Sequence, residues 1–270
     1  MRFGYCGGYD AKELDFAKRT GFDGIEIFVH TGHELLKPSV AKRVKEEFDK
    51  RGLKVLTVFH YEDFGNPDKA KARKAQATFA KAARLARAMG TKVVTCNAFA
   101  GPPDEAEQMK TFKRVFGGFA KVAKDEGVVV GIENCPHGLK NIAYTPALWE
   151  QLFDMVPRQI GLEFDPSHLV WQGIDYLSAI YEFADRIHAF HAKDTEVKDS
   201  VLADVGIYGK GWWRYRMPGM GQIDWNEIFT ALYDIGYKGD MIIEHEDPFF
   251  GGAKREHGLE LGLAHLKQYY

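Results

Sequence analysis

The chain lacks the features that mark several classes of protein. Its only cysteines are Cys6, Cys96 and Cys135, too few and too scattered for a disulfide framework or a thiolate zinc site. No apolar run approaches the roughly 18 residues that cross a bilayer, and residues 1–6 do not read as a charged-then-apolar signal peptide. These absences predict a protein of a reducing compartment, most simply the cytoplasm, with no membrane partner.

An excess of either charge is also missing. Lys and Arg number 36 against 38 Asp and Glu, for a formal net charge of −2, which gives no overall electrostatic footprint for nucleic acid. Hydrophobic residues make up 45% and charged residues 27% of the chain, the composition of a folded globular protein rather than a disordered one. We therefore expect a small-molecule partner and no nucleic acid, and a homo-oligomer stays open.

Short apolar runs alternate with longer helical patterns along the whole chain. Eight runs are apolar at consecutive positions, as parallel strands buried on both faces require: residues 2–7, 24–29, 54–60, 92–99, 128–135, 160–165, 187–191 and 240–244. The segments between them repeat apolar residues three to four apart. Several end in a glycine, which tolerates the left-handed conformation that terminates a helix: Gly21, Gly52, Gly90, Gly127 and Gly236.

This alternation predicts an α/β protein that forms a single (β/α)₈ TIM barrel, with residues 1–270 as one domain. The competing architecture is a doubly wound open sheet, which normally carries a glycine-rich phosphate loop after its first strand. Gly7 and Gly8 are not followed by that spacing. In a barrel the active site lies at the C-terminal ends of the strands, so polar residues at those ends are the candidates for chemistry.

Four consecutive predicted strands end in a carboxylate or an imidazole: Glu133, Asp165, His191 and Glu244. Clustered carboxylates repel one another unless a positive charge compensates them, and a divalent cation does so economically. We therefore predict a four-ligand metal site. Three carboxylates and one imidazole favour Mn²⁺, with Mg²⁺ and Co²⁺ as alternatives, over a structural zinc ion. Glu246 faces the same side as Glu244 and competes with it for the fourth position.

Further strand-end residues surround this predicted site. His168 should project over the metal and contact substrate, and His60, which ends the third strand, is another candidate to line the pocket. Lys193 and Asp194 either form an ion pair at the rim or orient His191, since such partners fix the tautomer of a ligand.

The connection over residues 195–221 is long for a strand-to-helix loop, and such loops are usually functional or disordered. Residues 212–216 (WWRYR) are too aromatic for disorder. Aromatic rings stack on sugar faces, and arginine neutralises developing negative charge. Trp213, Arg214 and Arg216 are therefore candidate substrate contacts. The same composition also suits a subunit interface, so a substrate lid and an oligomer contact both stay open.

The second half of the chain resembles the xylose-isomerase-like barrel superfamily, which includes sugar phosphate isomerases and epimerases, tagatose 3-epimerase-like enzymes and inosose dehydratases. The resemblance is carried, in order, by GIEN at 131–134, DPSH at 165–168, HAKD at 191–194, GMGQIDW at 219–225 and IEHED at 243–247.

The resemblance implies a role for each matching position. Glu133, Asp165, His191 and Glu244 would bind the metal, the two glutamates would also act as acid–base groups on opposite sides of the substrate, and His168 would contact substrate. An arginine ahead of the glycine pair contacts substrate in the related epimerases, and here Arg214 and Arg216 both stand in that region.

The expected function is that of a metal-dependent sugar or keto-polyol isomerase or epimerase. A metal chelated by a carbonyl and the neighbouring hydroxyl stabilises the enediolate that forms when a carboxylate removes the adjacent proton. The same chemistry can expel a β-leaving group, so a lyase or dehydratase acting on a keto-sugar, keto-glycoside or inosose is the main alternative. An apurinic-site endonuclease, which shares the barrel but needs a three-zinc cluster, and a non-catalytic sugar-binding barrel are less favoured.

Overall fold

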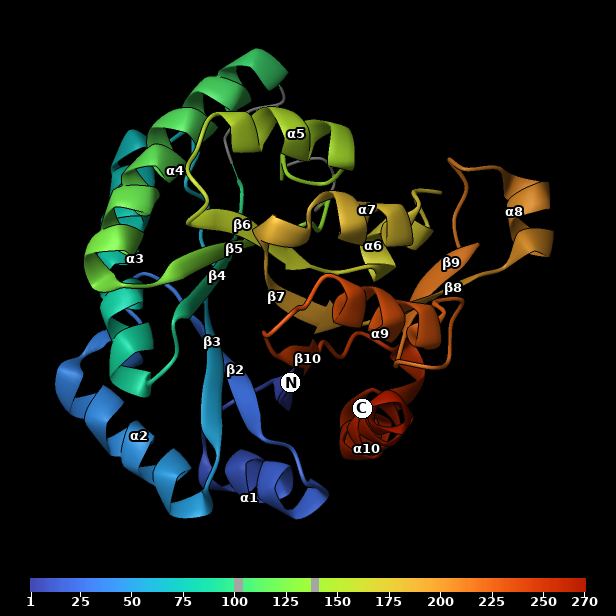
Figure 1. Ribbon diagram of the computed structural model, residues 1–270, viewed down its shortest axis with the longest axis horizontal. Helices are drawn as coiled ribbons and strands as arrows, with labels where there is room; N and C mark the ends of the chain where they lie inside the picture. The colour runs from blue at the N-terminus through green and yellow to red at the C-terminus, as the bar shows by residue number, and fades with distance from the viewer. Residues whose placement is uncertain (100–103, 137–140) are drawn as a thin grey trace.

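The computed structural model describes residues 1–99, 104–136 and 141–270. Within them, parallel strands close into a barrel in the order β1-β10-β7-β6-β5-β4-β3-β2 (Figure 1). The barrel strands are β1 (Phe3–Cys6), β2 (Gly24–Val29), β3 (Lys54–His60), β4 (Val93–Asn97), β5 (Val129–Glu133), β6 (Ile160–Phe164), β7 (Ile187–Ala192) and β10 (Met241–Ile243). The predicted (β/α)₈ barrel is thus confirmed, with all eight barrel strands at their predicted places.

Helices cover the outside of the barrel, and Figure 1 shows α2 to α5 as an arc around the strands. The α-helices are α1 (Ala11–Thr20), α2 (Pro38–Arg51), α3 (Lys69–Met89), α4 (Glu105–Glu126), α5 (Pro146–Asp154), α6 (Ser167–Val170), α7 (Tyr176–Glu182), α8 (Asp199–Val205), α9 (Trp225–Asp234) and α10 (Arg255–Leu266). The first four long helices end at left-handed glycines, as predicted: Gly21, Gly52, Gly90 and Gly127, with φ between 66° and 87°.

Aromatic side chains fix α3 and α4 against the barrel. Phe79 of α3 stacks on Phe119 of α4 with ring centroids 3.9 Å apart, and Phe64 meets Phe119 edge-on at 4.9 Å. All three rings are buried, and each buried phenylalanine contributes about 1.5–3 kcal/mol through the hydrophobic effect. This packing joins α3 to α4 and to the segment that follows β3.

A hairpin outside the barrel follows β7. Strand β8 (Asp194–Val197) pairs antiparallel with β9 (Trp213–Arg216), and the chain between these two strands carries α8, at the right edge of Figure 1. Residue Thr195 pairs with Tyr215, and Asp194 with Arg216. The sequence predicted only a long connection here. The strand geometry matters because alternate side chains of β9 point to opposite faces.

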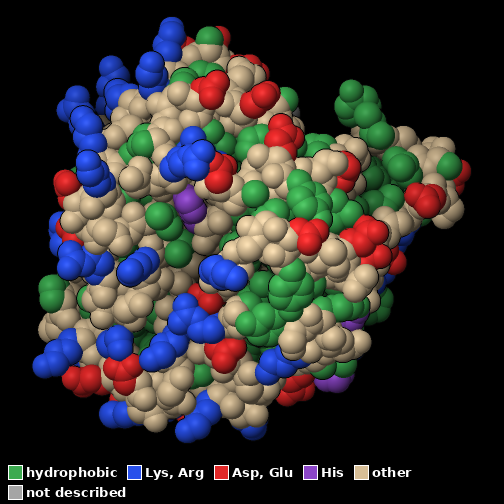
Figure 2. Space-filling model, viewed as in Figure 1, with side chains coloured by type: hydrophobic (Ala, Val, Ile, Leu, Met, Phe, Trp, Pro, Cys, Tyr) green, Lys and Arg blue, Asp and Glu red, His purple; other side chains and the backbone are tan. Residues whose placement is uncertain are grey.

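The surface charge is uneven although the net charge is small. Figure 2 shows Lys and Arg side chains gathered along the edge that α2, α3 and α4 form. Helix α3 has no Asp or Glu, and its basic residues are Lys69, Lys71, Arg73, Lys74, Lys81, Arg84 and Arg87. The expectation that nucleic acid is not a partner rests on net charge alone and stays a prediction.

No helix in the described part of the chain is both long and apolar enough to span a bilayer.

Candidate metal centre

Carboxylates from three barrel strands meet at one end of the barrel. Glu133 is the last residue of β5, Asp165 follows β6, and Glu244 follows β10. Together with His168, each of these residues places one potential ligand atom within 4.8 Å of the others. The structure therefore brings three of the predicted metal ligands together with the predicted substrate-contact histidine.

His191 borders this cluster from β7. Its Nδ1 lies 3.7 Å from Glu133 Oε1 and 3.5 Å from Glu244 Oε2. The ring is fully buried, and Nδ1 has no hydrogen-bond partner among the described residues. The fourth predicted ligand thus directs an unused nitrogen toward two of the carboxylates.

These residues fit a divalent metal ion. Buried polar atoms are normally hydrogen-bonded, yet neither His191 Nδ1 nor Asp165 Oδ2 has such a bond in the described structure, although Asp165 Oδ2 lies 3.2 Å from the ammonium of Lys193. A divalent cation would satisfy both atoms, and carboxylate oxygens with one imidazole nitrogen form a donor set that such ions accept. The residue group whose ligand atoms lie within 4.8 Å of one another contains His168 in place of His191, so the assignment of Glu133, Asp165, His191 and Glu244 as the four ligands stays a prediction.

Lys193 is the main residue whose position the sequence did not reveal. Its side chain is 1% exposed, and its ammonium contacts the carboxylate of Glu244 and lies 2.8 Å from Glu246 Oε2 and 3.2 Å from Asp165 Oδ2. The ammonium also lies 4.4 Å from the ring centroid of Tyr215, a cation–π contact. Lys193 therefore supplies positive charge to a cluster of carboxylates.

Of the two alternatives for Lys193 and Asp194, the described residues do not form the ion pair, and orientation of His191 stays a prediction. The carboxylate of Asp194 accepts hydrogen bonds from the backbone N–H groups of Gly219 at 3.0 Å and Ile223 at 3.1 Å, and from Trp225 Nε1 at 3.1 Å. Asp194 thereby fastens the segment after β9 to the start of the hairpin.

Both candidate acid–base glutamates are held in their charged form. Burial acts to raise the pKa of Glu133, but contacts with His168 and His191 outweigh it and hold that pKa well below its usual value. Burial likewise opposes ionisation of Glu244, and the ammonium of Lys193 outweighs it and lowers the pKa of Glu244 to about 2. A carboxylate that is ionised at neutral pH can bind a cation and accept a proton.

The hairpin reaches the site through aromatic residues. Tyr215 Oη lies 2.7 Å from His168 Nδ1, and Trp213 stacks on Trp171 with ring centroids 4.6 Å apart. The sequence drew attention to Trp213 and missed Tyr215. Once the pairing with β8 shows that residues 213–216 form a strand, the two-residue alternation places Trp213 and Tyr215 on the same face of β9.

Arg214 and Arg216 lie on the other face of β9. Arg214 pairs with Glu196, and Arg216 Nε lies 2.8 Å from Asp247 Oδ2. Both guanidinium groups also lie over the ring of Phe249, 4.8 and 5.3 Å from its centroid. Carboxylates thus already neutralise both arginines, and their predicted contact with substrate stays a prediction.

The structure does not bring His60 to the metal cluster. Its fully buried ring packs near Phe64 and Phe79, with centroids 5.3 and 6.2 Å away. Neither ring nitrogen has a hydrogen-bond partner in the described structure. The predicted substrate contact of His60 gains no support from this placement.

Burial of His60 predicts a loss of stability in acid. Desolvation lowers its pKa from 6.5 to about 4, so the folded state keeps the ring neutral while the unfolded state binds a proton below pH 6.5. The stabilisation is complete above pH 6.5 and declines as the pH falls toward 4, by about 2 kcal/mol between pH 7.5 and pH 5. In urea unfolding at both pH values, His60→Leu should lose correspondingly less stability than the wild type. Equal losses would contradict this.

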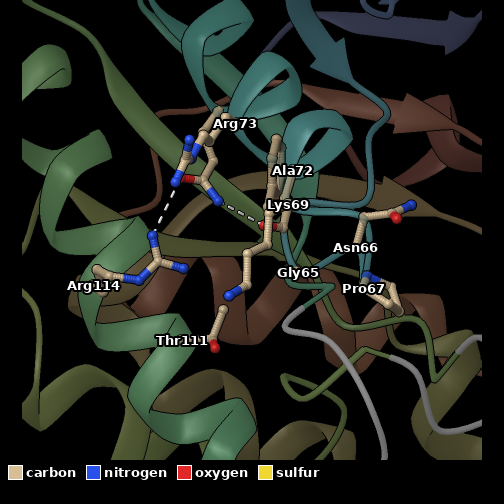
Figure 3. A pocket seen from close by; sticks show the side chains of 10 residues that line it. Gly65, Asn66, Pro67, Lys69, Ala72, Arg73, Thr111 and Arg114 are labelled. Carbon is tan, nitrogen blue, oxygen red and sulfur yellow. Dashed lines mark hydrogen bonds between the residues drawn. The ribbon is translucent and has the colours of Figure 1, made fainter.

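A hollow outside the barrel, at the start of α3, has a different character. It encloses about 350 Å³ and is lined by Lys69, Arg73 and Arg114 but by no carboxylate or histidine. Figure 3 shows these cationic side chains around the hollow. Arg114 donates a hydrogen bond to Gln76 Oε1 at 3.4 Å. The lining of the hollow among the described residues contains no carboxylate or imidazole, which are the groups that proton transfer at neutral pH normally uses.

Comparison with known proteins identifies the family of the chain. The family model "Xylose isomerase-like TIM barrel" matches residues 14–269. The chain belongs to this family. Among curated relatives, the uncharacterized protein YfiH of Bacillus subtilis is 30% identical over 157 residues, which are 54% of this chain and 49% of YfiH. The match therefore spans about half the length of YfiH. An inosose dehydratase of Erwinia tasmaniensis is 27% identical over 251 residues, 84% of this chain and 80% of that protein.

Several solved structures have the same fold as this chain. D-psicose 3-epimerase from Clostridium cellulolyticum H10 superposes with a TM-score of 0.78 at 17% identity, covering 100% of this chain and 99% of that one. An IolI protein with a bound zinc atom gives a TM-score of 0.76 at 19% identity, covering 100% and 99%. At such identities the likeness shows the fold alone.

Proposed function

We propose that the chain is a divalent-metal-dependent sugar or keto-polyol isomerase or epimerase that removes a proton next to a carbonyl group. The observation that carries the proposal is the position of Glu133 and Glu244, which lie together with Asp165 and beside His191 at the end of the barrel. The names of the relatives, which include inosose dehydratases and sugar epimerases, support the same class of chemistry.

The residues divide the work as follows. Glu133, Asp165, His191 and Glu244 would hold the metal ion, which would stabilise the negative charge that develops on the substrate oxygen. One ionised glutamate would accept the proton from carbon, and the other, once it has taken up a proton from solvent or from a substrate hydroxyl, would deliver a proton to the opposite face, which inverts that carbon. Asn97 Nδ2 donates a hydrogen bond to Glu133 Oε2 at 2.9 Å and so orients this carboxylate.

A dehydratase that eliminates a β-hydroxyl is the second candidate. The curated relatives named inosose dehydratases favour it, and Lys193 suits it chemically. Burial lowers the pKa of Lys193, but Asp165 and Glu244 outweigh it and raise that pKa well above its usual value. The ammonium therefore stays charged and can donate a hydrogen bond to a departing hydroxyl. Product analysis by NMR with a panel of ketoses and keto-inositols separates the two reactions, because only the dehydratase yields an unsaturated product or its tautomer.

The metal dependence is directly testable. Purified protein should hold one divalent ion per chain, chelation with EDTA should abolish turnover, and Mn²⁺ or Co²⁺ should restore it best. Elemental analysis and kinetics on the reconstituted protein measure this. Absence of a bound divalent ion together with turnover unaffected by EDTA would refute the proposal, and three metal ions per chain would favour a nuclease.

The contact between Tyr215 and His168 should affect substrate binding. Tyr215→Phe removes the hydroxyl that lies 2.7 Å from His168 Nδ1, and loss of one such hydrogen bond should lower kcat/KM roughly two- to tenfold. Metal affinity should not change, because Tyr215 is not a ligand. Tyr208→Phe is the matched control, since Tyr208 lies in the segment between β8 and β9 and is 97% exposed. If both variants behave alike, the hairpin does not act through His168.

A further inference from the structure

The second nitrogen of His191 lies in a buried polar group inside the barrel. Nε2 is 3.1 Å from Glu26 Oε1, with which it forms a hydrogen bond, and 3.7 Å from Cys6 Sγ. Glu26 belongs to β2 and His191 to β7, which are not neighbours in the sheet. Their contact therefore crosses the interior of the barrel, just beyond the predicted metal ligands.

Hydroxyl groups hold the Glu26 carboxylate in place. Thr57 Oγ1 and Thr95 Oγ1, from β3 and β4, both donate to Glu26 Oε2, the second at 3.2 Å. The other oxygen, Oε1, faces His191 and also accepts a bond from Cys6 Sγ at 3.5 Å. Glu26, Thr57 and Thr95 are at most 1% exposed, so the carboxylate has one fixed orientation.

We propose that Glu26 is a positioning residue that keeps the proton of the neutral His191 ring on Nε2, so that Nδ1 offers its lone pair to the metal cluster. The inference deepens the proposed function, because it rests on His191 as a metal ligand. A carboxylate that accepts the distal N–H of a ligating histidine fixes its tautomer and makes it a better ligand, and removing the carboxylate typically costs 10–100-fold in metal affinity.

Glu163 is the competing carboxylate. Its Oε1 lies 3.2 Å from His191 Nε2, as close as Glu26. However, neither oxygen of Glu163 has a hydrogen-bond partner in the described structure, so the ring N–H is directed to Glu26 and no donor fixes the orientation of Glu163. The geometry therefore favours Glu26 as the residue that sets the tautomer.

The variant Glu26→Gln tests this because it replaces the charged acceptor of the His191 N–H with a neutral amide. With the threonine hydroxyls turned to accept from the amide NH₂, the amide oxygen faces His191 Nε2 as a weaker, neutral acceptor. With both hydroxyls still donating to the position of Oε2, the amide oxygen takes that position and the NH₂ faces His191 Nε2. An NH₂ group donates, which requires an unprotonated Nε2 and moves the ring proton to Nδ1. That is the atom that faces Glu133 and Glu244, so metal ligation would be opposed.

Zinc is the probe for the experiment. In the metal-free protein burial disfavours the charged ring, but Glu163, Cys6 and Glu26 outweigh it and raise the pKa of His191 well above its usual value, so the tautomer is read in the Zn²⁺-loaded protein. Two-bond ¹H–¹⁵N NMR should show His191 ligated through Nδ1 and protonated at Nε2. Competition titration with a chromophoric chelator should give roughly 10–100-fold weaker Zn²⁺ binding for Glu26→Gln, and a loss within about threefold for Glu163→Gln.

The outcomes separate the inference from the proposed function. A wild type that binds no Zn²⁺ contradicts both. Ligation through Nδ1 with undiminished affinity in Glu26→Gln contradicts only the inference, as does a loss confined to Glu163→Gln. Ligation through Nε2 in the wild type also overturns the inference, as does a second Zn²⁺ ion held by Cys6 and Glu26. Both results are obtained with the wild-type protein, so they do not depend on whether a variant folds.

Discussion

Replacing Glu133 or Glu244 with glutamine is expected to lower turnover by roughly 10²–10⁴-fold. Glutamine keeps the shape of the side chain and one ligand oxygen, but an amide cannot accept the substrate proton. Steady-state kinetics should be measured beside the metal content of each variant, so that the loss of the base is distinguished from the loss of the metal. The expected result is a large fall in kcat even in protein that is saturated with metal.

Glu246→Gln is the matched control for this experiment. Glu246 lies two residues after Glu244 and contacts the same lysine, at 2.8 Å, but its side chain is 47% exposed, and it does not belong to the group that can share a metal ion. Its replacement should cost less than about tenfold. Should Glu246→Gln abolish turnover while Glu244→Gln leaves it intact, the roles of the two glutamates are reversed.

Replacing Lys193 with methionine should destabilise the metal-free protein by about 3–5 kcal/mol. Methionine fills a similar volume, but the buried carboxylate of Asp165 and the largely buried one of Glu244 would lose the ammonium that compensates them. A divalent cation would supply the missing charge, so adding Mn²⁺ should raise the melting temperature of the variant more than that of the wild type. Calorimetry with and without the metal measures both effects.

Lys210→Met controls for the general effect of removing a lysine, because Lys210 is exposed in the insertion after β8 and should tolerate the change. Equal stability of Lys193→Met and the wild type without metal would show that Lys193 does not compensate the cluster. A variant that metal fails to stabilise further would show that the carboxylates do not share one cation site.

The barrel could be predicted because its strands are buried on both faces. Such strands must be apolar at consecutive positions, a pattern that differs from the helical repeat on either side. Strands β2 and β3 occupy residues 24–29 and 54–60, as predicted. The glycines predicted the C-terminal ends of the first four long helices. Glycine adopts a positive φ easily, so the end of a helix could be located from the local sequence.

The candidate ligands could be predicted for a related reason. All parallel strands of a barrel end at the same rim, so residues such as Glu133 and Glu244 must approach each other once the barrel is known. The partners of Lys193 could not be predicted. Its side chain pairs with Glu244, which lies 51 residues further along the chain, and no local sequence pattern indicates that contact. Tyr215 was missed because its place depends on the pairing of β8 with β9, which no local pattern of the long connection announced.

The most direct test of proton abstraction at a metal centre is solvent exchange in D₂O. Metal-loaded wild type, incubated with a keto-sugar or keto-inositol that it converts, should introduce deuterium at the carbon next to the carbonyl, as followed by NMR. Exchange should stop when EDTA removes the metal and in Glu133→Gln and Glu244→Gln. Conversion of substrate without deuterium at that carbon, or exchange that continues in the metal-free protein, would contradict the proposed chemistry.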